Sequence, residues 1–296
     1  MRRFAYERPA SLAEASSLLA QAGEGARILA GGTDLVVGLR DDTIQPEIVV
    51  DLKWVEEFQG QTIDVRNGHF IFNALATMTQ IEHDVRVLGQ LPALAEAARV
   101  VGSVQIRNRA TLAGNICNGS PAADTAPPQL LYGAVVVVAG PDGERRQTVD
   151  EFMLGARRPG PDKRKVDLRP GELVTAIEMP VPAADFSAAY TRLVRRKGTD
   201  LASITLGVSV DGGGVTQVAY GSVGPRAFLA RDESGVLADP TAGREARAAI
   251  LDELLSQATP SPRSIRAGPD SRLAMLPVLA MRALDSALER RSGSAA

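Results

Sequence analysis

The stretch Leu29-Ala30-Gly31-Gly32-Thr33-Asp34-Leu35 decides the architecture, because it joins a short apolar segment to a pair of glycines. Residues 27–30 predict a short buried strand, so the glycines stand at the end of that strand. Glycines at this point let consecutive backbone amides turn inward with no Cβ in the way, which makes a nest for an anion. An ordinary turn after a strand has the same pattern, so this loop alone does not distinguish the two.

A second glycine-bearing loop, Arg109-Ala110-Thr111-Leu112-Ala113-Gly114-Asn115-Ile116, brings a hydroxyl, a glycine and an amide side chain close together. A pyrophosphate held between two such loops needs little formal positive charge, because amides and hydroxyls supply the hydrogen-bond donors. Neither loop matches the dinucleotide fingerprint G-x-G-x-x-G, and neither is followed by the Gly-Lys-Ser/Thr of a P-loop. The sequence therefore disfavours a Rossmann fold and a P-loop fold.

Composition narrows the classes of function open to this chain of 296 residues. Lys and Arg total 33 and Asp and Glu total 35, a formal charge of −2 that argues against nucleic acid as the main partner. The single cysteine, Cys117, excludes a disulfide framework, a four-cysteine zinc site and an iron–sulfur cluster held by this chain alone. With only His69 and His83 as histidines, redox chemistry would need an organic cofactor. We expect a cytoplasmic protein, because no membrane span or signal-peptide run is evident.

The order of predicted elements indicates an α+β fold with a two-lobed N-terminal domain over residues 1–178. The first lobe, about 1–53, has a helix opened by a capping box at Ser11–Glu14 and ended by Gly23. The second lobe, 54–178, has a helix with a second capping box that we place at Thr79–Glu82. A C-terminal domain over 183–291 has three predicted antiparallel strands followed by two helices; the strands are 187–194, 204–210 and 215–220, and the helices are about 244–257 and 272–291.

Residues 157–170 differ sharply in composition from their surroundings, with six basic residues, two aspartates and three prolines. One interpretation is a basic docking or anion-binding loop. The other is a solvated surface insertion, because runs of charge are usually just solvated.

Six motifs, in order and at family-like spacing over nearly the whole chain, resemble the FAD-binding medium subunit of the molybdenum hydroxylases, the family of carbon monoxide and xanthine dehydrogenases. They are Ala30-Gly31-Gly32-Thr33-Asp34, Thr111-Leu112-Ala113-Gly114-Asn115-Ile116, Ser120-Pro121-Ala122-Ala123-Asp124, Pro170-Gly171-Glu172-Leu173-Val174, Arg195-Arg196-Lys197-Gly198-Thr199-Asp200-Leu201-Ala202 and Gly221-Ser222-Val223-Gly224-Pro225. The resemblance implies a two-lobed FAD-binding domain of the PCMH type. A smaller C-terminal α+β domain, with a three-stranded antiparallel sheet and helices, would cover the isoalloxazine ring.

Carried over by position, the two loops would wrap the FAD pyrophosphate and ribityl chain between the lobes. Ala30, Gly31, Gly32, Thr33 and Asp34 would form one side, and Thr111, Gly114 and Asn115 the other. 

Three further residues would lie around the flavin ring. Asp124 falls where the family has an aspartate near the polar edge of the flavin or the ribityl hydroxyls, although it could instead cap a helix before Pro127. Tyr190 and Arg192 fall where the family places an aromatic and a basic side chain, and a cation there would stabilise the charge of a reduced flavin.

Two of these assignments have alternatives within the sequence. Tyr190 could equally pack within a strand with its hydroxyl at the rim. A slip of register would make Arg195 or Lys197 the ring-facing cation instead of Arg192. Cys117 is expected to be a buried apolar residue, with a reactive thiol as the alternative. Because neither glycine loop contains a histidine, we expect non-covalent FAD. Because no cluster of metal-ligating residues is evident, we expect no metal on this chain.

The resemblance also implies partners. A large subunit would carry the molybdenum cofactor and hydroxylate the substrate, and a small subunit would carry two [2Fe–2S] clusters. This chain would take electrons onto FAD and pass them to an acceptor such as NAD, a quinone or a cytochrome, within a heterohexamer. Two alternatives are a self-sufficient flavoprotein oxidoreductase of the same superfamily and a non-catalytic FAD-binding assembly protein.

Overall fold

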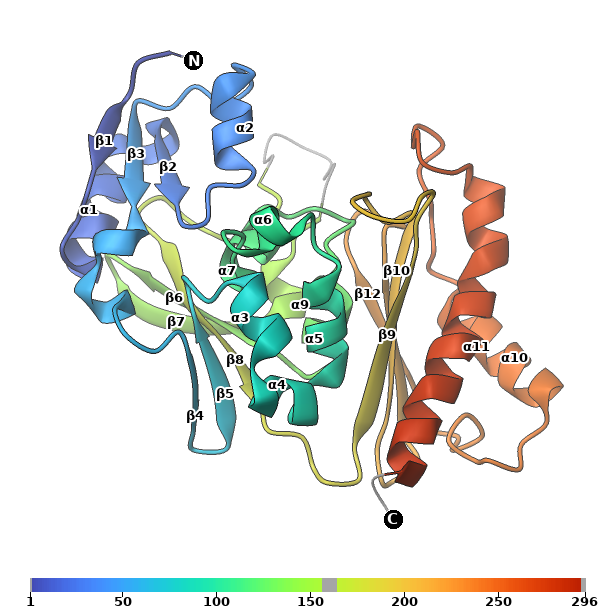
Figure 1. Cartoon of the computed structure of the whole chain (residues 1–296). Coiled ribbons are helices and arrows are strands. Elements are labelled where there is room, and N and C mark those ends of the chain that lie inside the picture. The colour runs from blue at the N-terminus through green and yellow to red at the C-terminus, as the bar shows by residue number, and fades with distance from the viewer. Residues whose placement is uncertain (1, 156–163, 294–296) are drawn as a thin grey trace.

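The computed structural model describes residues 2–155 and 164–293 and contains three sheets (Figure 1). The first sheet is parallel, in the order β1-β3-β2, and includes β1 (Ala5–Glu7), β2 (Ala26–Leu29) and β3 (Ile48–Asp51). Its helices are α1 (Leu12–Ala22) and α2 (Leu35–Arg40), and short 3₁₀ turns lie at Gly23–Gly25, Leu52–Trp54 and Glu56–Phe58.

The predicted N-terminal cap of α1 is confirmed. The Ser11 hydroxyl accepts a hydrogen bond from the backbone N–H of Glu14 at 3.2 Å, which satisfies one of the free amides of the first turn. The Glu14 carboxylate reaches back to the N–H of Ala10, one residue before the expected Ser11. Ala15 and Leu19 on the inner face are buried in the main apolar core.

The second sheet has five antiparallel strands in the order β4-β5-β8-β6-β7. Its strands are β4 (Ile63–Arg66), β5 (His69–Asn73), β6 (Val135–Gly140), β7 (Gly143–Thr148) and β8 (Leu173–Pro180). The helices of this part of the chain are α3 (Met78–His83), α4 (Val85–Gln90), α5 (Pro92–Arg99), α6 (Val104–Arg107), α7 (Leu112–Cys117), α8 (Ala126–Leu131) and α9 (Val149–Phe152).

The capping box of α3 lies two residues earlier than the sequence predicted. Thr77 and Gln80 form it, with the Thr77 hydroxyl accepting from the Gln80 N–H and the Gln80 side chain accepting from the Thr77 N–H. Thr79 lies inside the helix, where its hydroxyl donates to Asn108 Oδ1 at 2.7 Å. The prediction was wrong because Thr77-x-x-Gln80 and Thr79-x-x-Glu82 both have the spacing of a capping box.

The third sheet has four antiparallel strands, one more than the sequence predicted, in the order β12-β11-β10-β9. They are β9 (Ser187–Leu193), β10 (Ile204–Val210), β11 (Thr216–Gly221) and the additional strand β12 (Phe228–Asp232). α10 (Arg244–Leu254) and the long helix α11 (Pro269–Gly293) follow, and α11 packs on β9 and β10. Helix α5 contacts β9, and α8 contacts β10, β11 and β12. In Figure 1, α5 and α11 lie on opposite sides of the third sheet.

Buried apolar side chains form two clusters. The larger extends through the first and second sheets and includes Phe70, Phe72 and Ile177. The smaller lies between the third sheet and α10 and α11, with Leu206, Tyr220 and Leu284 among its members. The chain passes from the second sheet to the third between Pro180, the end of β8, and Ser187, the start of β9.

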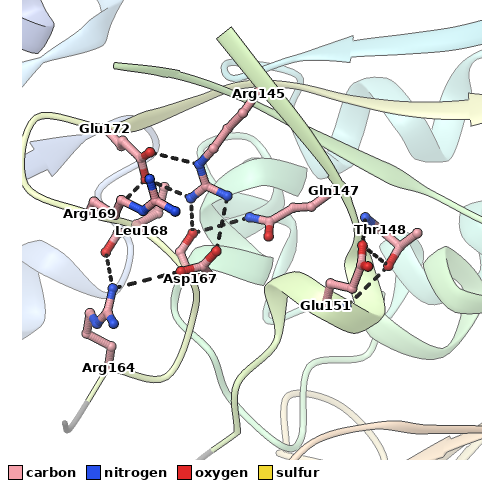
Figure 2. A network of polar contacts seen from close by, with 9 residues as sticks. All are labelled: Arg145, Gln147, Thr148, Glu151, Arg164, Asp167, Leu168, Arg169 and Glu172. Carbon is pink, nitrogen blue, oxygen red and sulfur yellow. Dashed lines mark hydrogen bonds and ion pairs between the residues drawn. The ribbon is translucent and has the colours of Figure 1, made fainter. Parts of the chain in front are cut away.

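Arg145 on β7 fixes the segment that precedes β8, as Figure 2 shows. Its guanidinium donates to both carboxylate oxygens of Glu172, at 2.8 and 2.7 Å, and to Asp167 Oδ2 at 3.1 Å. Arg164 lies 3.8 Å from Asp167, so this end of the basic segment forms intramolecular pairs. Residues 157–163 of that segment lie outside the described residues, and both interpretations of it stay predictions.

Candidate functional site

The first glycine loop connects β2 to α2, and Gly32 has the left-handed φ of +76° that favours glycine. The Gly32 carbonyl accepts from the N–H of Val36 at 2.9 Å and so begins the helix. Within the described residues, the backbone N–H groups of Gly32, Thr33 and Asp34 have no backbone acceptor. Three consecutive donors therefore remain available at the end of a strand, as an anion-binding loop requires.

The two glycine loops touch each other through their backbones. A Cβ built on Gly31 would lie 2.0 Å from the Arg109 carbonyl oxygen and 3.1 Å from the Cα of Ala110. Only glycine fits at such an approach, because any side chain would push the loops apart. The sequence predicted two loops facing one ligand, and the structure brings them into direct contact.

Lys53 supports the first loop from the side of β3. Its ammonium group forms an ion pair with Asp51, which is buried, and lies 3.4 Å from the Ala30 carbonyl oxygen. Burial opposes ionisation of Asp51, but hydrogen bonds from Lys53 and Tyr6 outweigh it and hold its pKa below the usual value. Lys53 thereby joins the buried Asp51 carboxylate to the backbone of the first loop.

Thr111 starts α7 from the second loop. Its hydroxyl accepts from the Gly114 N–H at 3.0 Å, so the predicted hydroxyl and glycine are neighbours. The Asn115 side-chain oxygen accepts from the Thr125 hydroxyl at 2.6 Å, which leaves its amide N–H groups as donors for a ligand. Through Thr125, the second loop is connected to the adjacent Asp124.

Asp124, Tyr190 and Arg192 meet between the second lobe and the third sheet. The Tyr190 hydroxyl donates to Asp124 Oδ1 at 2.6 Å, and the Arg192 guanidinium lies 3.3 and 3.4 Å from the two carboxylate oxygens. The Asp124 carboxylate is buried, and the Arg192 side chain is largely so. The alternative role of Asp124 as a helix cap is not observed, because α8 begins after Thr125 and no side chain caps it.

The pKa values of the Asp124 and Tyr190 side chains are both raised. Burial is the main cause at Asp124, and it outweighs the hydrogen bond from Tyr190 and the charge of Arg192, which act to lower the pKa. Burial and the neighbouring carboxylate raise the pKa of Tyr190 well above its usual value. Perturbed titrating groups of this kind cluster at functional sites.

Of the three basic residues considered for the ring, only Arg192 contacts Asp124. Arg195 instead pairs with Asp200 at 3.1 Å and lies 3.4 Å from the Ile265 carbonyl oxygen. Lys197 is exposed. The geometry therefore favours the register in which Arg192 is the cation of the site.

The other residues considered in the sequence are Cys117 and the two histidines. Burial raises the pKa of the Cys117 thiol to about 12, which favours an unreactive thiol over a nucleophile. His69 and His83 form hydrogen bonds to the backbone oxygens of Asn67 and Thr79. Across residues 2–155 and 164–293, His, Cys, Asp and Glu form no group that could hold a metal ion.

Sequence reasoning missed Glu96, whose carboxylate accepts from the Tyr190 backbone N–H at 2.9 Å. Tyr190 lies on β9, an edge strand whose outer N–H groups have no strand partner, and Glu96 of α5 supplies the acceptor. Glu96 also pairs with Arg290 of α11. No motif contains Glu96, so nothing in the sequence signalled this contact.

Comparisons with known proteins identify the family. Residues 2–182 match the family described as the FAD-binding domain in molybdopterin dehydrogenase. The xanthine dehydrogenase FAD-binding subunit of Escherichia coli O157:H7 is 29% identical over 293 residues, 97% of each chain. The carbon monoxide dehydrogenase medium chain of Hydrogenophaga pseudoflava is 30% identical over 292 residues, 97% of this chain and 98% of that one.

A solved structure shows the same similarity to carbon monoxide dehydrogenase. Carbon monoxide dehydrogenase from Hydrogenophaga pseudoflava, in a form that lacks the Mo-pyranopterin moiety of its cofactor, matches with a TM-score of 0.86, 30% identity and 98% coverage of both chains. The chain belongs to the family of FAD-binding subunits of xanthine and carbon monoxide dehydrogenase-type molybdenum hydroxylases. The resemblance inferred from six motifs, the oxidoreductase class and FAD as cofactor are thereby confirmed.

Proposed function

We propose that this chain is the electron-exit subunit of a molybdenum hydroxylase, which takes electrons from [2Fe–2S] clusters of a partner and passes them to an external acceptor. The main support for the proposal is that the residues predicted to bind FAD are joined by a continuous series of contacts. Gly31 touches Arg109, Thr111 caps the helix that contains Asn115, and Asn115 binds Thr125 beside Asp124. Asp124 then binds residues of the third sheet. An extended dinucleotide would contact successive residues along this line.

The residues on this line fit the parts of FAD. Free backbone N–H groups on Gly32, Thr33 and Asp34 would bind the pyrophosphate, opposite the first turn of α7. Ala30 and Gly31 would supply the close backbone approach, with Thr111, Gly114 and Asn115 on the other side. FAD binding of this kind relies on uncharged hydrogen-bond donors, which agrees with the low net charge of the chain.

Asp124, Tyr190 and Arg192 would set the environment of the flavin ring. When bound, FAD would accept electrons one at a time and hold two of them, which links one-electron clusters to a two-electron acceptor. Arg192 would stabilise negative charge at the ring, and Asp124 would hold both Arg192 and Tyr190 in place. Arg192→Ala is expected to lower the flavin reduction potential with FAD still bound, while Lys197→Ala should leave the potential unchanged. An unchanged potential in Arg192→Ala would remove Arg192 from this role.

The arrangement also supports the domain boundaries expected from the sequence. We place the FAD-binding domain at 1–178, with lobes of about 1–53 and 54–178, and the ring-covering domain at 183–291. The partners would be a large molybdenum-cofactor subunit and a small [2Fe–2S] subunit, in a cytoplasmic heterohexamer. None of the helices in residues 2–155 and 164–293 is long and apolar enough to span a membrane.

Purification of the tagged chain from its native host tests the subunit assignment. Molybdenum and iron should accompany FAD at a fixed ratio through two different columns. A Gly32→Val, Gly114→Val variant serves as the control, because Cβ atoms at these loops should abolish FAD retention. Flavin without molybdenum or iron would contradict the proposal and favour a self-sufficient flavoprotein or an assembly protein.

A further inference from the structure

A cavity of about 740 Å³ has residues of the third sheet's turns among its lining, and none of its lining residues belongs to the two glycine loops. Its sides are the 120–122 loop, the 222–225 turn and the segment 259–266 that precedes α11. Arg263, Arg266 and Arg272 all line it, and we call it the arginine cavity. The remaining lining residues are neutral, so no carboxylate balances the three guanidinium groups within the lining.

Arg272 is the most deeply placed of the three, with 3% of its surface exposed. Its guanidinium donates to two backbone carbonyls, of Ser222 at 2.8 Å and of Ser261 at 2.6 Å. Within the described residues it forms no ion pair with an Asp or Glu side chain. Burying a charge without an opposite charge is costly, so the site favours an anion.

The position of Arg272 in α11 adds to this positive potential. Arg272 is the fourth residue of a 25-residue helix, and its N–H donates to the Gly268 carbonyl at the start of that helix. A helix N-terminus carries partial positive charge, so a cation there is unfavourable and an anion is favourable. The acidic residue of the first turn, Asp270, is exposed and does not line the cavity.

Two buried polar atoms on the lining residues lack a hydrogen-bond partner in the described part of the chain. They are the Ser222 hydroxyl oxygen and Nε of Arg272. Ser222 is also held at a φ of +66°, a conformation that non-glycine residues rarely adopt. Buried polar atoms are normally paired, so these two atoms are available to bind a ligand group.

The donor set matches phosphate. Guanidinium groups bind phosphate oxygens through paired charge-assisted hydrogen bonds, and hydroxyls supply further donors. The cavity adds the hydroxyls of Ser120, Thr259 and Ser264 to its arginines. We propose that the arginine cavity binds a phosphate-bearing anion, either free phosphate or the phosphate group of a nucleotide, in addition to FAD.

The cavity is coupled to the candidate flavin site by a short connection. The Ser222 N–H donates to the Pro121 carbonyl at 2.7 Å, and the 120–122 loop ends two residues before Asp124. A bound anion would therefore stabilise the loop that supplies Asp124. It would not replace the FAD pyrophosphate, which we place at the glycine loops.

Titration calorimetry of the FAD-loaded protein tests this proposal, with sodium phosphate and ADP as separate probes at constant ionic strength. We expect saturable binding, weakened about tenfold or more in Arg263→Gln and in Arg266→Gln. Arg231→Gln is the matched control, because Arg231 is an exposed arginine of the same sheet that pairs with Glu233 and does not line the cavity. Arg272 is left intact because its two backbone hydrogen bonds also support the fold.

The outcomes separate the sources of the anion. Much tighter binding of ADP than of phosphate would assign the cavity to a nucleotide, and similar affinities would assign it to free phosphate. Absence of saturable binding for both probes overturns the proposal, as does equal affinity in the Arg263→Gln, Arg266→Gln and wild-type proteins. The titrated sample is then passed through an ultrafiltration membrane. FAD in the filtrate would also overturn the proposal, because the anion would then be competing for the flavin site.

Discussion

Gly31→Ala is the change that most sharply perturbs the contact between the two glycine loops. The new Cβ would lie 2.0 Å from the Arg109 carbonyl oxygen and 2.7 Å from its carbonyl carbon. Because such contacts do not occur below about 3 Å, the loops must separate by about 1 Å or more. Overpacking of this kind costs about 1–3 kcal/mol, which corresponds to roughly a 5- to 150-fold weaker affinity if the separation is borne by the FAD site.

Two measurements distinguish loss of the site from loss of the fold. Flavin fluorescence titration gives the Kd for FAD, and urea unfolding of the apoprotein gives the free energy of unfolding. Gly89→Ala is the control, because Gly89 lies in α4 and a Cβ there would meet no heavy atom within 4 Å.

The reasoning predicts a clear pattern. Gly31→Ala weakens FAD binding by more than its apoprotein loses in stability, whereas Gly89→Ala leaves FAD binding unchanged and raises the free energy of unfolding by about 0.5–1 kcal/mol, as Gly→Ala does inside a helix. A Gly31→Ala protein that binds FAD as tightly as the wild type would refute the placement of the dinucleotide between these loops.

Three further perturbations concern single side chains. The Cys117 thiol, whose pKa burial raises to about 12, should react with iodoacetamide at pH 8 much more slowly in the folded protein than in urea; equal rates would show an accessible thiol. Tyr190→Phe removes a hydrogen bond that lowers the pKa of Asp124, so that pKa should rise further. Because the raised pKa means that folded Asp124 holds its proton longer than unfolded Asp124, stability falls as pH rises, and Tyr190→Phe should be more destabilising at pH 8 than at pH 4 in urea unfolding. A pH-independent difference would separate Tyr190 from the ionisation of Asp124. Arg145→Ala leaves the Glu172 carboxylate without its paired donors and should lower the free energy of unfolding by about 1–3 kcal/mol, whereas an unchanged value would assign that network to the solvated surface.

The glycine loops could be predicted from the sequence because their conformations depend on local chemistry. Gly32 needs a left-handed φ and Gly31 needs room for a neighbouring backbone, and only glycine meets both conditions. The capping hydroxyl of Ser11 follows from the same local rules. The cap of α3 was predicted two residues too late, because Thr79-x-x-Glu82 has the same spacing as the observed Thr77-x-x-Gln80.

The meeting of Asp124, Tyr190 and Arg192 could not be derived from local patterns. Asp124 and Tyr190 are 66 residues apart, and only the packing of the third sheet against the second lobe joins them. Family resemblance indicated these residues, and their role toward FAD stays a prediction. Glu96 could not be found in this way, because its contact depends on the packing of α5 beside the edge strand β9.

The fourth strand of the third sheet was missed for a different reason. β12 is only 5 residues long, and it alternates partly buried with exposed side chains, as an edge strand does. Its register is set by pairing with β11 over Thr216–Tyr220 rather than by its own sequence. Whether such a short segment forms a strand depends on its pairing with a neighbouring strand more than on its own residues.

Reoxidation of the iron–sulfur clusters in the intact complex tests the central claim most directly. The clusters are reduced anaerobically with dithionite, the reductant is removed, and NAD, a quinone and cytochrome c are offered in turn to complexes with and without FAD. The account predicts that at least one acceptor reoxidises the clusters of the FAD-containing complex, and that removal of FAD slows this reaction about tenfold or more. Equal rates with and without FAD would contradict the role of this chain as the exit for electrons.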